Sequence, residues 1–253
     1  MSHFIADDGA KIHVRVSGEG PPIVMLHGWT SSHHEWAPFL NDLNRRHRVY
    51  RWDARGHGGH PADNGDPPTA ERMARDFANL LDHYGLGKVV AVGHSMGALN
   101  GWVLAAQRPD LVRGVVAWGV SGVISPEELA SVERWLPVSA WGAERERWRQ
   151  QIIERHGAEQ LESMIEGWVG AARAISARGG NICYEQAARI ECPVLLLNGD
   201  GEVGNTPRDA RRLAERIPGG RLTFVADSGH AIHRDQPAAL LGHIHDFLTK
   251  VEG

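Results

Sequence analysis

Apolar runs and stretches with helical spacing alternate along most of the chain. Ile23-Val24-Met25-Leu26 is typical of a parallel strand buried on both faces, whereas residues 11–16 alternate apolar and polar like a half-exposed strand. The predicted strands cover residues 3–5, 11–16, 23–26, 49–53, 89–92, 112–118, 193–198 and 221–226. The predicted helices cover residues 36–43, 69–84, 96–107, 207–217 and 237–251, with Thr69 as a helix cap. Strands that alternate with helices predict an α/β fold with a mainly parallel, twisted sheet flanked by helices.

Residues 121–190 break this alternation, because they have helical character and no convincing strand. Within them, Ser125-Pro126-Glu127-Glu128 is typical of a helix start with proline at the first helical position. Five tryptophans lie in or at the edge of this segment, at positions 118, 135, 141, 148 and 168. We therefore expect a core formed by residues 1–120 and 191–253, with a helical segment inserted after the sixth core strand.

The composition is that of an ordinary globular protein, since 42% of the 253 residues are hydrophobic and 23% are charged. The 27 Lys and Arg against 31 Asp and Glu give a net charge of −4, so there is no electrostatic reason to expect a nucleic-acid partner. No apolar run approaches the roughly 18 residues that a membrane span needs, and no membrane partner is expected. A small-molecule substrate is the partner that we expect, for a monomer or a homodimer.

The N-terminal residues lack the basic and apolar regions of a signal peptide, so we expect a cytoplasmic protein. Cys183 and Cys192 do not form a disulfide framework, and their spacing suits neither a zinc site nor a redox pair. We interpret both as packing residues. His33 and His34 are adjacent and are poorly placed to share a metal ion. We predict no metal site and no cofactor.

Gly93-His94-Ser95-Met96-Gly97 joins the predicted strand over residues 89–92 to the helix that follows. A serine hydroxyl is a poor nucleophile in water, but it becomes useful when a sharp strand-to-helix turn holds it beside a base and N–H donors. Such a turn crowds the positions two residues before and after the serine, and both are glycine here. The helix N-terminus also favours negative charge that develops beside it. This context favours Ser95 as a nucleophile over a serine that only caps a helix.

His230 is the best-placed base among the 15 histidines. It lies on a loop after the predicted strand over residues 221–226, and loops at the carboxyl ends of strands form the ligand crevice in open α/β sheets. His233, three residues further on, is the competing candidate. The base needs a carboxylate that fixes its tautomer, and both Asp200 and Glu202 follow a predicted strand at the same edge of the sheet.

Four stretches together resemble the α/β-hydrolase superfamily, over essentially the whole chain outside residues 121–190. They are His27-Gly28-Trp29, Asp53-Ala54-Arg55-Gly56-His57-Gly58, Gly93-His94-Ser95-Met96-Gly97 and Gly229-His230. The resemblance implies the α/β-hydrolase fold, with Ser95 as nucleophile and His230 as general base, in the chain order serine, acid, histidine. It also implies an oxyanion hole formed by the backbone N–H groups of Trp29 and Met96. The glycine-rich loop over residues 55–61 begins within the family's aspartate–arginine–glycine loop, which is usually structural.

The resemblance favours Glu202 as the acid, because the family's acid usually follows the glycine of this loop by three residues, here counted from Gly199. The sequence departs from the family pattern at this point, since aspartate is usual there. Glutamate is longer by one methylene and must place its oxygen differently. Asp200 stays an alternative, either as the acid or as a residue that caps the turn.

Residues 121–190 resemble the family's helical cap, a lid that excludes water and shapes the substrate pocket. Its tryptophans could line a wide apolar or aromatic site or form the cap's own small core, and for any single one we favour the core. Trp29, Trp118 and Ser121 adjoin the catalytic edge of the sheet, and they are better candidates for substrate-binding walls.

The resemblance implies a serine hydrolase that cleaves a carboxylic ester, lactone or related acyl bond of a small, apolar or aromatic substrate through an acyl-Ser95 intermediate. Relatives that hydrolyse epoxides or haloalkanes carry aspartate at the nucleophile position, so Ser95 argues against those reactions. Cofactor-free carbon–carbon bond hydrolases, lyases and perhydrolases use the same set of residues and stay alternatives. A non-catalytic ligand receptor is a further alternative, although the presence of both Ser95 and His230 favours an enzyme.

Overall fold

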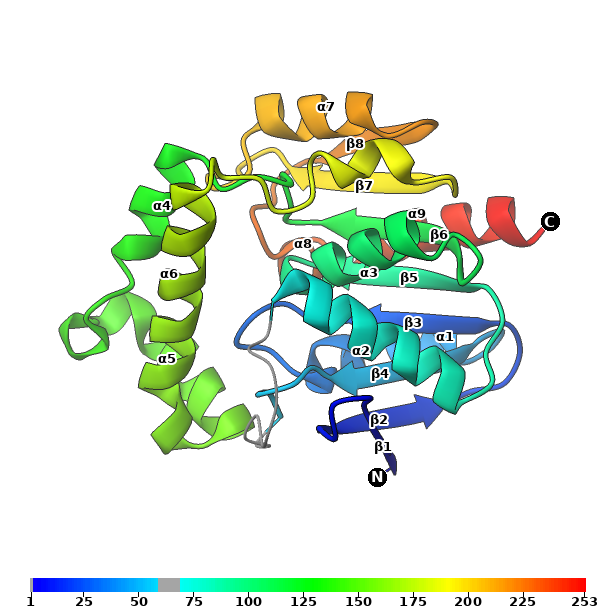
Figure 1. Cartoon of the computed structure of the whole chain (residues 1–253), viewed down its shortest axis with the longest axis horizontal. Helices are drawn as coiled ribbons and strands as arrows, with labels where there is room; N and C mark the ends of the chain where they lie inside the picture. Colours follow the sequence, from blue (N-terminus) through cyan, green and yellow to red (C-terminus); the bar gives the residue numbers. More distant parts are fainter. Residues whose placement is uncertain (1, 59–68) are drawn as a thin grey trace.

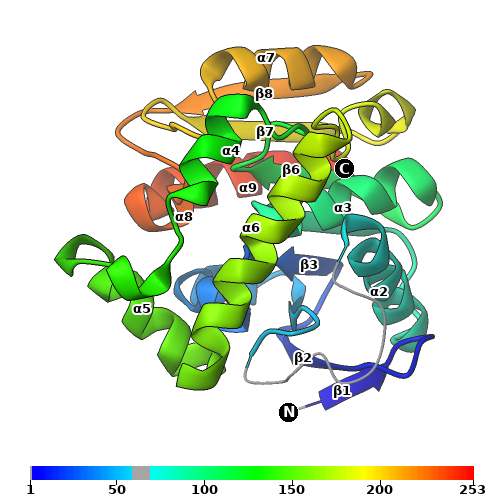
Figure 2. The same cartoon turned by 60° about the vertical axis from the view of Figure 1, so that its left-hand side comes forward.

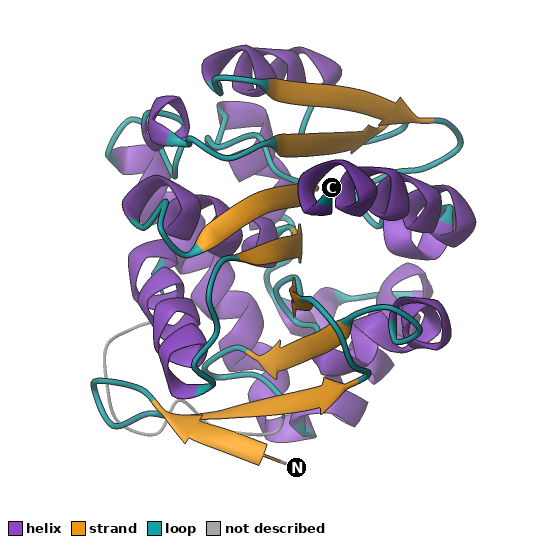
Figure 3. Ribbon diagram, turned by 90° about the vertical axis from the view of Figure 1, so that its right-hand side faces the viewer, coloured by secondary structure: helices purple, strands orange, loops and turns teal. Residues whose placement is uncertain are grey.

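An eight-stranded sheet with helices on both faces forms the body of the protein, in a computed structural model that describes residues 2–58 and 69–253 (Figure 1). The strands are β1 (Ser2–Ile5), β2 (Lys11–Ser17), β3 (Pro22–Leu26), β4 (Arg48–Asp53), β5 (Val89–His94), β6 (Val112–Trp118), β7 (Val194–Gly199) and β8 (Gly220–Val225). Their order is β1-β2-β4-β3-β5-β6-β7-β8. Only β1–β2 and β2–β4 are antiparallel pairs among these strands, which confirms the prediction of a mainly parallel sheet. Figure 3 shows the twist of the sheet.

The helices of the core occupy the expected places between the strands. They are η1 (His33–Phe39), α1 (Leu40–Leu43), α2 (Ala70–His83), α3 (Met96–Gln107), α7 (Pro207–Arg216), α8 (Ile232–Asp235) and α9 (Pro237–Glu252). Thr69 caps α2 as predicted, because its side chain accepts a hydrogen bond from the backbone N–H of Arg72. The helix expected over residues 36–43 is instead a 3₁₀ turn followed by one short α-helical turn. Pro38 lies inside this segment and has no N–H for an α-helical hydrogen bond.

Two hydrophobic layers cover the two faces of the sheet. Val24 and Leu26 of β3 face the layer formed with α2, α3 and α7, whereas Ile23 and Met25 face the layer formed with η1 and α9. Successive residues of a strand point to opposite faces, so a strand covered on both sides must be apolar at every position. This explains the unbroken apolar runs in the sequence.

A third cluster of buried side chains belongs to the inserted segment alone. Its helices are α4 (Pro126–Glu133), η2 (Val138–Ala140), α5 (Ala143–His156), η3 (Ala158–Gln160) and α6 (Leu161–Ala177). Ser125 caps α4 with Pro126 at its first position, as predicted. A further short turn, η4 (Gln186–Arg189), packs on α3, and Cys183 and Ile190 beside it join the core of the sheet. The separately packed helices therefore end at residue 177, before the predicted boundary at residue 190.

The inserted helices lie beyond the edge of the sheet toward which the parallel strands point (Figure 1), and α6 crosses in front of that edge (Figure 2). Hydrogen bonds join them to the loop after β3. The indole N–H of Trp29 donates to the carbonyl of Met164 at 2.8 Å, and that of Trp148 donates to Oγ1 of Thr30 at 3.0 Å. His156 accepts from the N–H of Gly58 at 2.9 Å through Nδ1, so its Nε2 donates to the carbonyl of Thr30 at 3.1 Å.

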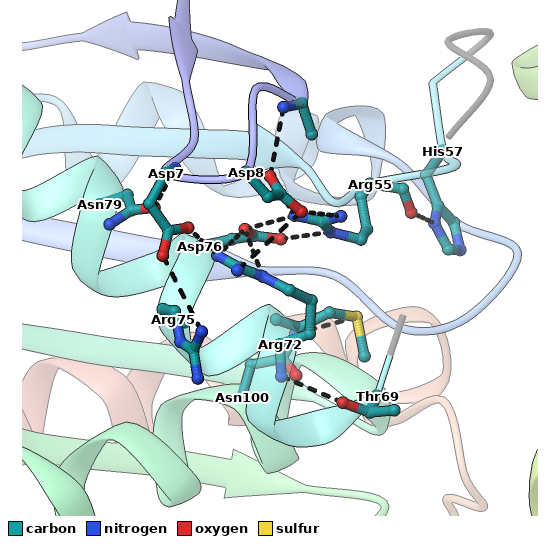
Figure 4. A network of polar contacts seen from close by, with 12 residues as sticks. Asp7, Asp8, Arg55, His57, Thr69, Arg72, Arg75, Asp76, Asn79 and Asn100 are labelled. Atoms are coloured by element: carbon teal, nitrogen blue, oxygen red, sulfur yellow. Dashed lines mark hydrogen bonds and ion pairs between the residues drawn. The ribbon is translucent and has the colours of Figure 1, made fainter. Parts of the chain in front are cut away.

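The loop after β4 has the structural role that its family resemblance implies. Arg55 pairs with Asp76 of α2 through two contacts of 2.7 Å, and with Asp8 at 2.9 Å (Figure 4). Arg72 also pairs with Asp76 at 2.9 Å, so one buried carboxylate holds two guanidinium groups. Residues 59–61 of the predicted glycine-rich loop lie outside the described residues.

Cys183 is buried in the core and Cys192 packs against it, so both are packing residues as predicted. Among residues 2–58 and 69–253, no helix is both long enough and apolar enough to cross a membrane.

We predict that Asp76→Ala destabilises the protein by about 3–5 kcal/mol, because it leaves two buried guanidinium groups without their shared carboxylate. Urea denaturation measures the free energy of unfolding. The control is Asp82→Ala, an exposed aspartate on the same helix, which should change this free energy by no more than about 0.5 kcal/mol. Equal effects of the two substitutions would contradict a special role for Asp76.

Candidate active site

Ser95 lies at the tip of a sharp turn between β5 and α3. Its backbone has a φ of 52° and a ψ of −117°, a conformation that residues with side chains rarely adopt. A Cβ on Gly93 would lie 2.6 Å from the backbone nitrogen of Ala98, and a Cβ on Gly97 would collide with the carbonyl oxygen of Leu26. Both glycines are therefore required by close packing, as the motif predicts. The turn places Ser95 at the N-terminus of α3.

His230 and Glu202 form a hydrogen-bonded pair. Nδ1 of His230 lies 3.0 Å from Oε2 of Glu202, whose side chain is only 4% exposed. The other carboxylate oxygen of Glu202 accepts from the N–H of Gly204 at 3.1 Å and from that of Asn205 at 3.5 Å. A carboxylate only accepts, so Nδ1 carries the proton and Nε2 is free to act as a base.

The pair shifts the pKa values of both partners toward the charged forms. Burial alone would lower the pKa of His230, but the hydrogen bond to Glu202 and the charge of its carboxylate outweigh this effect and raise the pKa above its usual value. Burial alone would raise the pKa of Glu202, but the hydrogen bond and charge of His230 lower it. An imidazolium that forms at His230 is therefore stabilised by Glu202.

The two competing candidates lie elsewhere. Asp200 is exposed, and its carboxylate accepts from the N–H of Ser228 at 3.4 Å, so it holds the turn that precedes His230. His233 is buried, with Nε2 at 3.9 Å from a carboxylate oxygen of Glu35. The structure thus brings Glu202, and not Asp200, against His230.

The two expected oxyanion donors are backbone N–H groups beside Ser95. Met96 is the first residue of α3. Trp29 follows Gly28, and a Cβ placed on Gly28 would lie 3.4 Å from the Cβ of Ser95. Within residues 2–58 and 69–253, neither the N–H of Trp29 nor that of Met96 donates a hydrogen bond. The Ser95 hydroxyl likewise has no hydrogen-bond partner there. These groups are therefore free to meet a ligand.

A cavity of about 430 Å³ lies beside Ser95 and Trp29, between the sheet edge and the inserted helices. It is lined by Ser95, His230, Glu202, Trp29, Ser121, Leu99, Glu128, Val132, Trp135, Trp148, Trp168, Arg234 and neighbouring residues. Two of the three predicted substrate-binding walls, Trp29 and Ser121, are therefore on the cavity. Three tryptophans of the insertion also line it while packing against the insertion's own core.

The prediction that Trp118 forms a wall is wrong. Trp118 is fully buried, stacks on His94 with ring centroids 5.7 Å apart and packs edge-on against Trp36. As the last residue of β6 it points to the same face of the sheet as Val116, the face covered by η1 and α9. The sequence showed that Trp118 adjoins the catalytic edge but not which face its side chain occupies.

A buried polar cluster that the sequence analysis missed lies beneath Ser95. Nδ1 of His94 lies 3.0 Å from Oε1 of Glu35, and His233 is near the same oxygen. Burial lowers the pKa of His94, and it lowers the pKa of His233 to about 3. Burial alone would raise the pKa of Glu35, but the charge and the hydrogen bond of His94 outweigh this effect and lower it. The ligand atoms of these three side chains lie within 4.8 Å of one another, a spacing that could hold a metal ion and that Asp7, Asp8 and Asp76 also have.

The family profile described as the alpha/beta hydrolase fold matches residues 21–152. The chain is also 37% identical over 270 residues to 2-(acetamidomethylene)succinate hydrolase of Mesorhizobium japonicum, an alignment that covers 97% of this chain and 96% of that protein. The chain belongs to the α/β-hydrolase family, and it is an enzyme of that fold.

Two further similarities agree with this assignment. Serine hydrolase BPHL of Homo sapiens is 28% identical over 235 residues, which cover 90% of this chain and 80% of that protein. The crystal structure of the enol-lactonase from Burkholderia xenovorans LB400 superposes with a TM-score of 0.78 at 28% identity, over 98% of this chain and 100% of that one.

We predict that the pKa of His230 is higher than that of an unperturbed histidine, and that Glu202→Gln lowers it because the imidazolium loses its carboxylate partner. Histidine-resolved NMR titration measures both values. Asp200→Asn serves as the control, and it should leave the titration of His230 near that of the wild type, since Asp200 contacts the backbone of Ser228. A larger change in the pKa of His230 in the Asp200 variant than in the Glu202 variant would identify Asp200 as the partner of His230.

Proposed function

We propose that this enzyme is a serine hydrolase that cleaves a carboxylic ester or lactone of a small, apolar or aromatic substrate through an acyl-Ser95 intermediate. One observation carries the proposal: Ser95, Trp29 and the His230–Glu202 pair line one cavity, and the N–H of Met96 directly follows Ser95 at the start of α3. A cavity of about 430 Å³ has the size of a small-molecule site. The similarity to proteins named serine hydrolase and enol-lactonase supports the same reaction class.

The mechanism follows from the roles that we assign to these groups. Nε2 of His230 takes the hydroxyl proton of Ser95 as Oγ attacks the carbonyl carbon. The N–H groups of Trp29 and Met96 stabilise the oxyanion, a contribution of about 10²–10³ in rate for each donor. His230 then gives its proton to the leaving alkoxide. A water molecule, deprotonated by His230, then attacks the acyl carbon, and the bond to Oγ breaks as His230 returns that proton to Ser95. Glu202 stabilises each imidazolium that forms.

We assign the role of a cap to the inserted helices. Trp135 of the α4–η2 connection, Trp148 of α5 and Trp168 of α6 close the cavity on the side away from the sheet. A covered cavity excludes water and strengthens the electrostatic contacts inside it. Trp29 and Ser121, from the core side, complete the walls that we expect a substrate to contact.

We predict that Ser95→Ala lowers kcat/KM for a nitrophenyl ester by on the order of 10⁴-fold, because no other group can form the acyl intermediate. Intact-mass spectrometry after exposure to a small fluorophosphonate should show one adduct on the wild type and none on the variant. Ser163→Ala, a serine on α6 away from the cavity, is the control and should keep both turnover and adduct. Substantial activity in the Ser95 variant would refute the assignment.

We predict that Glu202→Gln lowers kcat/KM by roughly 10²–10⁴-fold, because an imidazolium without its carboxylate is a costlier intermediate. Asp200→Asn should cost less than about tenfold. The wild-type kcat/KM should rise with pH through the raised pKa of His230, since only the neutral imidazole accepts the serine proton. The two rates and the pH profile are measured with the same ester. The reverse ranking of the two variants would identify Asp200 as the acid.

A further inference from the structure

Glu128 is an acidic side chain of the cavity for which the proposed reaction has no use. It is the third residue of α4 and lines the same space as Ser95 and His230. It lies close enough to His230 for each of the two charges to act on the pKa of the other. Glu128 is therefore near the reacting atoms, although no step of the mechanism requires it.

The carboxyl group of Glu128 has no lysine or arginine partner among the described residues. Its Oε2 is buried and has no hydrogen-bond partner among residues 2–58 and 69–253. Glu128 also forms no ion pair with a lysine or arginine of those residues. Two of the charged groups that influence it, Glu202 and Asp209, are themselves acidic. A buried polar atom without a protein partner is costly, and in a native protein it is usually satisfied by a water, an ion or a ligand or has a catalytic role.

Helix capping accounts for only part of this residue. Ser125 caps α4 by accepting from the N–H of Glu128 at 3.1 Å, and the backbone of Ser125 in turn forms a hydrogen bond that lowers the pKa of the Glu128 carboxyl. This reciprocal arrangement is a capping box, in which glutamine serves as well as glutamate. Capping therefore does not require the negative charge of this side chain, which lies on the cavity wall.

The side chains that share the cavity with Glu128 are mainly aromatic. Trp29, Trp135, Trp148 and Trp168 line it. The indole N–H groups of Trp29 and Trp148 already donate to protein acceptors, so these rings offer a ligand their carbon surfaces. Indole faces attract cations, and aromatic walls with a carboxylate are the combination that recognises ammonium groups.

We propose that the cavity selects substrates whose acyl chain carries a cationic ammonium group, held between the Glu128 carboxylate and the tryptophan walls while Ser95 attacks the ester carbonyl. The proposal rests on the proposed serine-hydrolase function and adds a substrate class to it. A bound ammonium supplies the positive charge that Glu128 lacks and leaves the capping of α4 unchanged.

The ionisation of Glu128 fits such a ligand. Burial raises the pKa of Glu128 to about 7, with Glu202 and Asp209 adding to the effect and His230 opposing it. A cation that binds beside this carboxyl group favours its ionised form and so lowers its pKa. Arg234 is another charged residue on the cavity to which the mechanism gives no role. It is exposed, and its guanidinium donates to the side-chain oxygen of Gln151 at 3.5 Å. An anionic substrate would have to use Arg234 instead.

The test compares three nitrophenyl esters whose acyl chains have the same number of methylenes and end in trimethylammonium, tert-butyl or carboxylate. At about pH 8, where Glu128 is ionised, we expect kcat/KM for the cationic ester to exceed that of its neutral isostere by about tenfold or more. Glu128→Gln should reduce this ratio to about one. The ratio removes any effect of Glu128 on His230, because that effect acts on both esters alike.

Glu127→Gln is the matched control, since Glu127 is an exposed neighbour in the same first turn, and it should keep the wild-type ratio. A ratio near one in the wild type, or a ratio that survives Glu128→Gln, would overturn the proposal while the turnover of the neutral ester still supports a serine hydrolase. A preference for the carboxylate ester would also overturn it and point to Arg234.

Direct binding separates this proposal from the proposed reaction. Tryptophan fluorescence of the Ser95→Ala variant, titrated with benzyltrimethylammonium, reports on the cavity without turnover. Quenching that saturates, and that is lost when Glu128→Gln is added, would support the cation site even if none of the three esters were hydrolysed. The absence of saturable quenching would count against the cation site, whatever the esterase activity.

Discussion

The backbone at Ser95 is held in a conformation that residues with side chains avoid, at a cost on the order of 1–3 kcal/mol. The turn closes only because Gly93 and Gly97 bring no side chain into the contact with Leu26 and Ala98. The surrounding sheet and α3 stabilise this turn, which fixes the position of the Ser95 hydroxyl. Every other group of the candidate site is useful only through its distance from that hydroxyl.

Much of the fold and part of the site could be predicted from the sequence, because they depend on local chemistry. The strands of the sheet follow from apolar runs, and the turn at Ser95 follows from paired glycines. His230 followed from its place after a strand, and the preference for Glu202 came from the family's spacing. Glu202 does contact His230 in the structure. The N–H groups of Gly204 and Asn205 hold the longer side chain of glutamate in the position where it makes this contact.

The remaining features depend on contacts between segments far apart in the chain, which no local pattern encodes. Trp118 adjoins the catalytic edge in sequence, yet its side chain packs beneath His94 on the other face. The Glu35–His94 pair joins residues 59 positions apart. Glu128 is recognisable in the sequence only as part of a helix start, because its position in the cavity depends on how α4 packs against the sheet edge.

The hydrogen bonds that Thr30 accepts bear on how this enzyme can diversify. Thr30, with a φ of 61°, receives Trp148 on its hydroxyl and His156 on its carbonyl, and it directly follows Trp29, a proposed oxyanion donor. An inserted segment of another sequence would leave these acceptors and the indole of Trp29 unpartnered. The two parts are therefore not interchangeable modules. Inheritance of a new helical segment requires matching changes in the loop after β3, so substrate range and catalytic geometry evolve together.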